Sequence, residues 1–230
     1  MARHGKRYRA VAALVDRTKL YDLREAIQFL KDHPSASFDE TMEVAFRMGL
    51  DPTKSEHAVR GVVALPHGTG KKVRVVVFAD GSAADAARAA GADAVGMQDL
   101  IEKIQGGWLD FDVAIATPDA MKEVRKLGKL LGPRGLMPNP KTGTVTEDVA
   151  EAVRQFQAGR VEFRMDKTGN IIVPFGKRSF STDALVENCQ AVIDAVRAAR
   201  PPSARGVYIR RCTVSSTMGP GLHVNVRDSA

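Results

Sequence analysis

The spacing of apolar and polar positions changes character twice along this chain of 230 residues. Apolar residues recur at helical spacing over 23–33, and they occupy every second position from Met42 to Met48 within residues 38–48. This pattern predicts a helix followed by a half-buried strand, whose other face carries polar residues. Residues 59–65 are predicted to be the partner of that strand.

Between Val73 and Ala158 the pattern predicts buried strands and helices in alternation. Strands are expected at 73–79, 94–96 and 111–116, and helices at 82–90, 97–105, 118–126 and 147–158. Such alternation is typical of a parallel sheet covered by helices on both faces.

After Gly159 the alternation of an antiparallel sheet returns. Strands are expected at 160–165, 170–174, 206–214 and 222–226, with a helix at 183–199. The segment Asp166-Lys-Thr-Gly between the first two strands is a typical hairpin turn.

These changes predict an α/β protein of two domains. An α+β domain is expected from residues 1–67 plus 159–230, with a Rossmann-like three-layer α/β domain of residues 68–158 inserted into it. Glycines near both crossings would permit the backbone angles that a hinge uses. The alternative is a single mixed sheet.

Charge is unevenly distributed along the chain. Residues 68–158 hold 12 Lys and Arg and 12 Asp and Glu, whereas the flanking residues hold 22 and 15, a difference of +7 that equals the net charge. An excess of cations suits a polyanionic partner. No run of eighteen apolar residues occurs, and the two cysteines are expected to be free thiols, so a cytoplasmic protein is predicted.

Known catalytic motifs are missing from the sequence. The turn Phe78-Ala-Asp-Gly-Ser-Ala lacks a dinucleotide-binding glycine pattern, and Gly68-Thr-Gly-Lys-Lys lacks the full phosphate-loop spacing. The five histidines are scattered and show no metal-binding spacing. We therefore expect no enzyme, no cofactor and no metal site. The competing hypotheses are a nucleotide-dependent enzyme that uses the α/β insert, and a protein scaffold with a merely solubilising basic surface.

Three segments suggest contacts with RNA. A basic loop rich in Gly and Pro lies within 122–141 and contains Arg134; Leu136 and Met137 indicate that this loop packs in one shape. The turn 215–221, Ser-Ser-Thr-Met-Gly-Pro-Gly, could bind ribose hydroxyls and phosphates, although such residues also simply form turns.

The third segment is the outward face of the strand over 38–48. Thr41, Glu43 and Arg47 point outward, whereas strict alternation places Phe38 on the inner side with Met42.

Together these segments resemble the bacterial ribosomal protein L1 family over nearly the whole chain. The most specific stretch is Leu131-Gly-Pro-Arg-Gly-Leu-Met-Pro-Asn-Pro-Lys-Thr-Gly-Thr-Val. The resemblance implies two hinged domains, of which the α+β domain grips a stalk helix of large-subunit rRNA near the tRNA exit site.

The resemblance also implies which residues and partners take part. The expected RNA-binding residues are Phe38, Thr41, Glu43, Lys167, Thr168, Ser215, Thr217, Met218 and Gly219, with a secondary contact through Arg134. Expected partners are the rRNA stalk, the protein's own operon mRNA, whose translation it would repress, and exit-site tRNA, whose release it would assist; the free protein would be a monomer. Ser37 and Ile171 depart from the family pattern, where relatives carry Lys or Arg and, in some cases, His.

Overall fold

The computed structural model describes residues 4–226, apart from the side chains of Ser55 and Lys141. The chain divides into two compact units, Met1–Gly70 with Val161–Ala230 (unit 1) and Lys71–Arg160 (unit 2). Its strands form three separate sheets of four, two and three strands, so the single mixed sheet is excluded for the described residues. The structure is a mixed α/β fold, as predicted.

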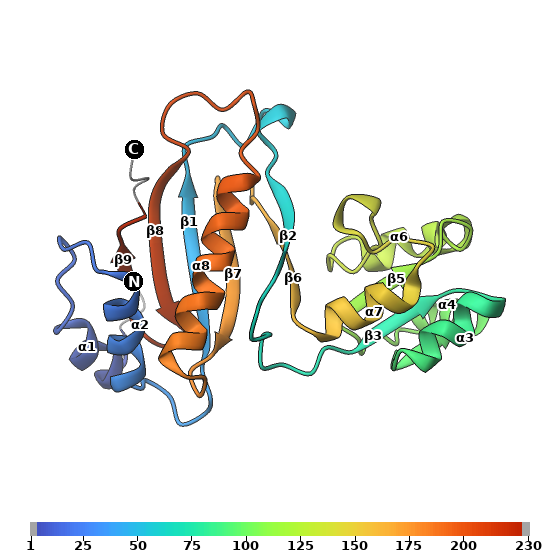
Figure 1. The fold of residues 1–230 in the computed structure, drawn as a ribbon, viewed down its shortest axis with the longest axis horizontal. Coiled ribbons are helices and arrows are strands. Elements are labelled where there is room, and N and C mark those ends of the chain that lie inside the picture. Colours follow the sequence, from blue (N-terminus) through green and yellow to red (C-terminus); the bar gives the residue numbers. More distant parts are fainter. Residues whose placement is uncertain (1–3, 227–230) are drawn as a thin grey trace. The chain divides into compact units, whose positions relative to one another are not determined.

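Over residues 4–70 and 161–226, unit 1 contains a four-stranded sheet and a two-stranded sheet with three α-helices. Its elements are α1 (Lys6–Ala12), α2 (Leu23–Asp32), β1 (Thr41–Met48), the 3-10 helix Ser55–His57, β2 (Arg60–Ala64), β6 (Arg160–Arg164), β7 (Asn170–Lys177), α8 (Thr182–Ala198), β8 (Ile209–Ser216) and β9 (Leu222–Val224). The larger sheet has the order β7-β1-β8-β9, so the N-terminal strand lies between two C-terminal ones (Figure 1).

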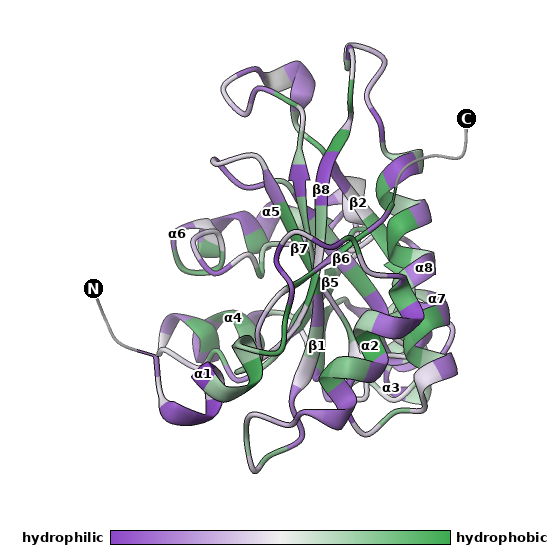
Figure 2. Cartoon of the chain, turned by 90° about the vertical axis from the view of Figure 1, so that its left-hand side faces the viewer, coloured by the Kyte–Doolittle hydropathy of each residue, from purple (hydrophilic) through white to green (hydrophobic). Residues whose placement is uncertain are grey.

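One face of the larger sheet packs against α2 and α8. Apolar residues of β1, such as Met42 and Phe46, are buried there with Ile27 of α2 and Val192 of α8. Both helices carry hydrophobic residues on one side and hydrophilic residues on another (Figure 2). Ser181 caps α8 by accepting a hydrogen bond from the backbone N–H of Ala184.

Two predicted pairings in unit 1 are wrong, although the strands themselves exist. β2 pairs with β6 and not with β1, whose partners are β7 and β8. β6 and β7 flank the turn Asp166–Gly169 as expected, but they lie in different sheets and form no hairpin ladder. Both errors concern which strand pairs with which, and alternation along one strand carries no such information.

Unit 2 is a three-stranded parallel sheet with helices on both faces. Its elements are β3 (Val75–Phe78), α3 (Gly81–Ala89), β4 (Ala94–Gly96), α4 (Gln98–Gln105), β5 (Val113–Ala116), α5 (Met121–Val124), the 3-10 helix Arg125–Leu127, α6 (Gly128–Leu131), the 3-10 helix Pro140–Thr142 and α7 (Val149–Gln157). The strand order is β4-β3-β5 and both pairings are parallel, which confirms the predicted sheet type.

The two faces of this sheet have separate apolar clusters. Val75 and Val77 face α3 and α7, while Val76 and Phe78 face α4 and the segment 120–131. The predicted helix 118–126 is shorter, since α5 gives way to a 3-10 turn at Arg125.

Candidate RNA-binding surface

The sheet face of unit 1 that lies opposite α2 and α8 is open. Alternation places Thr41, Glu43, Ala45 and Arg47 of β1 on it, while the residues between them are buried. The strand register places residues of β7 and β8 beside them on the same face. This open face comprises Thr41, Glu43, Ala45, Arg47, Asn170, Ile172, Pro174, Lys177, Arg211, Thr213 and Ser215. The segments from both ends of the chain thus build one surface.

Ile171 of β7 points to the face of the sheet opposite the open face. Its side chain is fully buried in the core, whereas Ile172 is exposed. The departure from the family pattern at residue 171 therefore changes no side chain of the open face.

The turn after β8 closes one end of the open face. The hydroxyl of Thr217 accepts a hydrogen bond from the backbone N–H of Thr41 (3.0 Å) and lies 3.3 Å from the carbonyl oxygen of Thr41. The backbone N–H of Thr217 donates to the same carbonyl oxygen (3.1 Å). Thr217 therefore extends the ladder between β1 and β8, and its hydroxyl is already engaged within the protein.

Gly219 has a structural reason of its own to be glycine. A Cβ at this position would collide with the hydroxyl of Ser216 and come within 3.5 Å of Leu30. The close approach keeps the turn tight, and Met218 projects from it with 55% of its surface exposed.

A buried carboxylate that the sequence pattern did not predict holds this turn. Glu40 has no exposed surface. Its Oε1 accepts hydrogen bonds from the backbone N–H of Met218 (3.0 Å) and the hydroxyl of Ser216 (3.4 Å), and Oε2 accepts from the N–H of Ser35 (3.3 Å). Arg178 lies 3.7 Å from Oε2. One carboxylate thus joins the turn to the loop before β1.

Phe38 is exposed, which overturns its predicted place on the inner side. β1 begins only at Thr41, and the residues before it bend, so alternation does not extend back to Phe38. The ring is 53% exposed and borders a hollow of about 460 Å³ lined also by Lys31, Ser37 and Arg178. Ser37, the other departure from the family pattern, lines this hollow together with two cations, Lys31 and Arg178, and one carboxylate, Asp39.

The expected residues Lys167 and Thr168 lie at the opposite end of the open face. Lys167 is exposed, whereas Thr168 is bound within its own turn: its hydroxyl donates to Asp166 Oδ1 (2.7 Å) and its carbonyl accepts from Arg47 (2.9 Å). Slight burial of Asp166 opposes ionisation, but hydrogen bonds from Asn170 and Thr168 outweigh it and lower the pKa of this carboxyl group.

Arg134 belongs to unit 2, so it is separate from the nine other expected residues. It is exposed in a turn after α6, and Gly135 beside it has a φ of +72°. Leu136 and Met137 pack against the core, which confirms the prediction that this loop packs. The side chain of Lys141, at the end of the basic stretch, lies outside the described residues.

The segments considered as enzyme sites have the geometry of ordinary connections. Gly68–Lys72 leads through a loop into β3, so it precedes a strand and not the N-terminus of a helix. Among the residues that the structure describes, no group of three His, Cys, Asp or Glu side chains could hold a metal ion. No helix in the same part of the chain is both long and apolar enough to span a membrane.

A basic surface on an antiparallel sheet, with glycine-containing turns at its ends, is typical of proteins that bind nucleic acids. A family model described as the Ribosomal protein L1p/L10e family matches residues 30–220. The chain belongs to this family. Its members are ribosomal proteins of the large subunit that bind rRNA, and they are not enzymes.

Proposed function

We propose that the chain grips a helix of the large-subunit rRNA stalk near the tRNA exit site through the open face and the turn 217–221. Phe38 and Met218 contact sugars or bases, and Lys167 and Lys177 contact phosphates. Glu43 accepts hydrogen bonds from ribose hydroxyls or base amino groups, which the edges of A-form RNA present. Arg134 supplies a second contact from unit 2.

One observation carries this proposal: two large apolar side chains are exposed in the two loops that Glu40 joins at one end of the open face. Phe38 and Met218 are each more than half exposed. The buried carboxylate of Glu40 joins those two loops by hydrogen bonds, and its burial has a cost in desolvation free energy. Loops that are fixed at such a cost and that expose apolar side chains are typical of a binding surface.

The role of Thr217 follows from its internal contacts. Since its hydroxyl bonds to the backbone of Thr41, replacing it by valine would remove a contact that stabilises the fold as well as any contact with RNA. Thr217→Val therefore cannot separate the two roles, and exposed side chains without internal partners make sharper probes.

The test uses Phe38→Ala and Met218→Ala with a fragment of the large-subunit rRNA stalk. Each variant is expected to bind about tenfold more weakly, since a base or sugar packed on such a side chain contributes about 1–3 kcal/mol. Thermal unfolding should be unchanged within experimental error, because both side chains are exposed and lie outside the core.

Leu14→Ala is the matched control, because Leu14 is an equally exposed apolar residue of unit 1, at 60%, outside the proposed surface. It should leave the affinity unchanged. Equal affinities for all three variants and the parent protein would remove this end of the sheet from the RNA site.

Further roles follow from the same surface. The two units are domains joined near Gly68 and Gly159, whose positive φ angles of 67° and 110° suit a hinge. The free protein is a monomer.

The surface also binds a stalk-like fold in the protein's own operon mRNA and so represses its translation, and stalk movement assists tRNA release. Competition between the rRNA fragment and the leader mRNA for one site tests the repression role; simultaneous binding of both would contradict it.

A further inference from the structure

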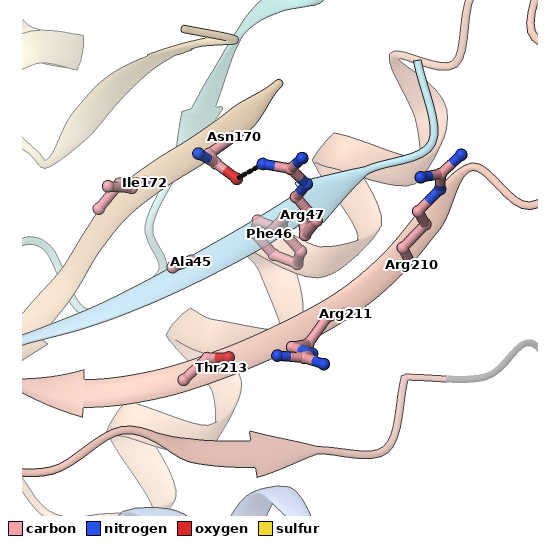
Figure 3. Close-up of a pocket in the computed structure, with 8 residues that line it drawn as sticks. All are labelled: Ala45, Phe46, Arg47, Asn170, Ile172, Arg210, Arg211 and Thr213. Carbon is pink, nitrogen blue, oxygen red and sulfur yellow. Dashed lines mark hydrogen bonds between the residues drawn. The ribbon is translucent and has the colours of Figure 1, made fainter. Parts of the chain in front are cut away.

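A hollow lies on the open face at the end farther from Thr217. It has a volume of about 640 Å³, and its lining includes Ala45, Arg47, Ile172, Arg210, Arg211 and Thr213 (Figure 3). Arg47 follows Thr41 by six positions on β1, which corresponds to about 20 Å along a strand. This hollow is therefore distinct from the turn 217–221 and from Phe38.

Three arginines line the hollow, and two of them occupy opposite positions on neighbouring strands. Arg47 of β1 and Arg211 of β8 are register partners, and Arg210 is adjacent on β8. Like charges opposite each other across a strand pair destabilise the sheet. Within residues 4–226, no carboxylate lies within 4 Å of any of the three guanidinium groups. An anion bound among these guanidinium groups would reduce the repulsion between them.

Arg47 is held in place for such an anion. Its Nη1 donates to the carbonyl oxygen of Thr168 (2.9 Å) and lies 3.3 Å from Oδ1 of Asn170, a contact drawn in Figure 3. The side chains of Arg210 and Arg211 form no hydrogen bond with the described residues, so their guanidinium donors remain available. A guanidinium fixed by neutral acceptors keeps its full charge and loses little further entropy on binding.

The charge of Arg211 acts on its neighbours. The pKa of His223 on β9 is lowered, first by burial of the ring and second by the positive charge of Arg211. His223 also contacts the hydroxyl of Thr213, which lines the hollow. An anion bound at Arg211 would offset this charge, so the His223 pKa reports on occupancy.

The lining of the hollow also includes apolar side chains. Ile172 is 58% exposed and lies beside Ala45, its register partner on β1. A simple anion would make no use of an exposed isoleucine next to guanidinium groups. A ligand with both a phosphate and a flat, weakly polar ring uses both parts of the surface.

We propose that this hollow binds one unpaired nucleotide of an RNA strand. Arg47 and Arg211 hold its phosphate with the help of Arg210, and its base or sugar packs on Ile172 and Ala45. This inference deepens the proposed RNA-binding function and rests on it. It adds a further contact within unit 1, which reads an unstacked nucleotide and not the regular helix.

The first arm of the test needs no knowledge of the natural RNA. The protein, labelled with ¹³C at isoleucine and alanine methyl groups, is titrated with a single-stranded tetraadenylate. Tetraadenylate is expected to shift the methyl signals of Ile172 and Ala45 and to raise the pKa of His223. Inorganic pyrophosphate should raise the His223 pKa and leave the Ile172 methyl in place. Equal shifts with pyrophosphate would reduce the site to a plain anion site, and shifts with oligoglutamate but none with tetraadenylate would make it a peptide site.

The second arm compares two RNA hairpins that differ by one unpaired nucleotide. The hairpin with the unpaired nucleotide should bind more tightly, and Arg211→Gln should abolish the difference by weakening that hairpin about tenfold. The slope of log affinity against log salt should fall by about 0.7–0.9, as one phosphate contact is lost. Without RNA, the variant should unfold at a slightly higher temperature, because repulsion with Arg47 is relieved.

Arg205→Gln is the control, since Arg205 is an exposed arginine just before β8 that does not line the hollow. It should preserve the preference for the unpaired nucleotide. If Arg205→Gln and Arg211→Gln lowered the affinity for the hairpin with the unpaired nucleotide equally, only the net positive charge would matter. That result would overturn the proposal. If Phe38→Ala and Met218→Ala do not affect stalk binding but tetraadenylate still shifts Ile172, the stalk proposal fails and the nucleotide site stands.

Discussion

Glu40 connects three segments that meet at one end of the open face. Its carboxylate accepts backbone hydrogen bonds from Ser35 and Met218 and lies beside Arg178, and none of its surface is exposed. Removing an acceptor from such a network leaves buried donors and a cation without partners.

Glu40→Ala should therefore lower the free energy of unfolding by about 3 kcal/mol, because Arg178 and the Met218 N–H lose their partner. Glu40→Gln keeps an oxygen that can accept from Met218, so a loss of about 1 kcal/mol is expected. Chemical denaturation measures both. The glutamine variant should also bind the rRNA fragment more tightly than the alanine variant; the opposite order would show that Glu40 does not position the turn.

At the scale of single residues, alternation in the sequence assigned the faces of β1 correctly from Thr41 to Met48. It failed at Phe38, because alternation holds only while the backbone is extended, and the chain bends before Thr41. It could not identify the partners of Glu40 either, since Ser216 and Met218 are more than 170 positions away in sequence. Burial of a carboxylate depends on such distant groups.

Among the elements, the turn Asp166–Gly169 is held largely by one side chain. Asp166 Oδ1 accepts hydrogen bonds from the backbone N–H groups of Thr168 and Asn170, both at 2.8 Å. The same turn supplies the carbonyl that fixes Arg47. The charge state of Asp166 thus affects the open face.

Because these hydrogen bonds lower the pKa of Asp166 below its ordinary value of 3.8, its ionised form stabilises the folded turn. The stabilisation is complete above pH 3.8 and is lost as the pH falls through the lower pKa of the folded state. Amide NMR signals of Thr168 and Asn170, followed during acid titration, should report a midpoint below 3.8. Asp166→Asn should remove this titration, and a midpoint at or above 3.8 would contradict the assignment.

Most elements were predictable because each reflects local periodicity, but their pairing was not. The parallel unit was predicted correctly, since a strand followed by a helix allows few arrangements. In unit 1, β2 was paired with the wrong strand, because its true partner β6 comes about 100 positions later. Nothing local distinguishes β6 from β1 as a partner for β2.

At the scale of the whole molecule, the excess positive charge lies in the segments that form unit 1. The sequence showed this directly, and the open face shows where part of it gathers, at Arg47, Lys177 and Arg211. The sequence could not show that Arg47 and Arg211 are opposite each other, because that depends on the register between strands from the two ends of the chain.

The apolar cores suggest that the units fold independently. One cluster contains only residues of unit 1, from Tyr21 to Val224, and the two others contain only residues of unit 2. Replacing Lys71–Arg160 by a short Gly-Ser linker should thus leave a protein that unfolds in one cooperative transition. It should also keep most of its affinity for the rRNA fragment, since nine of the ten expected contact residues remain.

The excised segment Lys71–Arg160, expressed alone, should show a cooperative thermal transition by circular dichroism. It should bind the fragment far more weakly, because its 13 Lys and Arg are nearly balanced by 12 Asp and Glu. Phe38→Ala in the shortened protein serves as the internal control: it must weaken binding by the same factor as in the full chain if the surface is intact. An aggregated or non-cooperative shortened protein would show that unit 1 needs unit 2 to fold, and would contradict the proposal of two domains. Strong binding by the excised segment would instead move the principal RNA contact to the loop of Arg134.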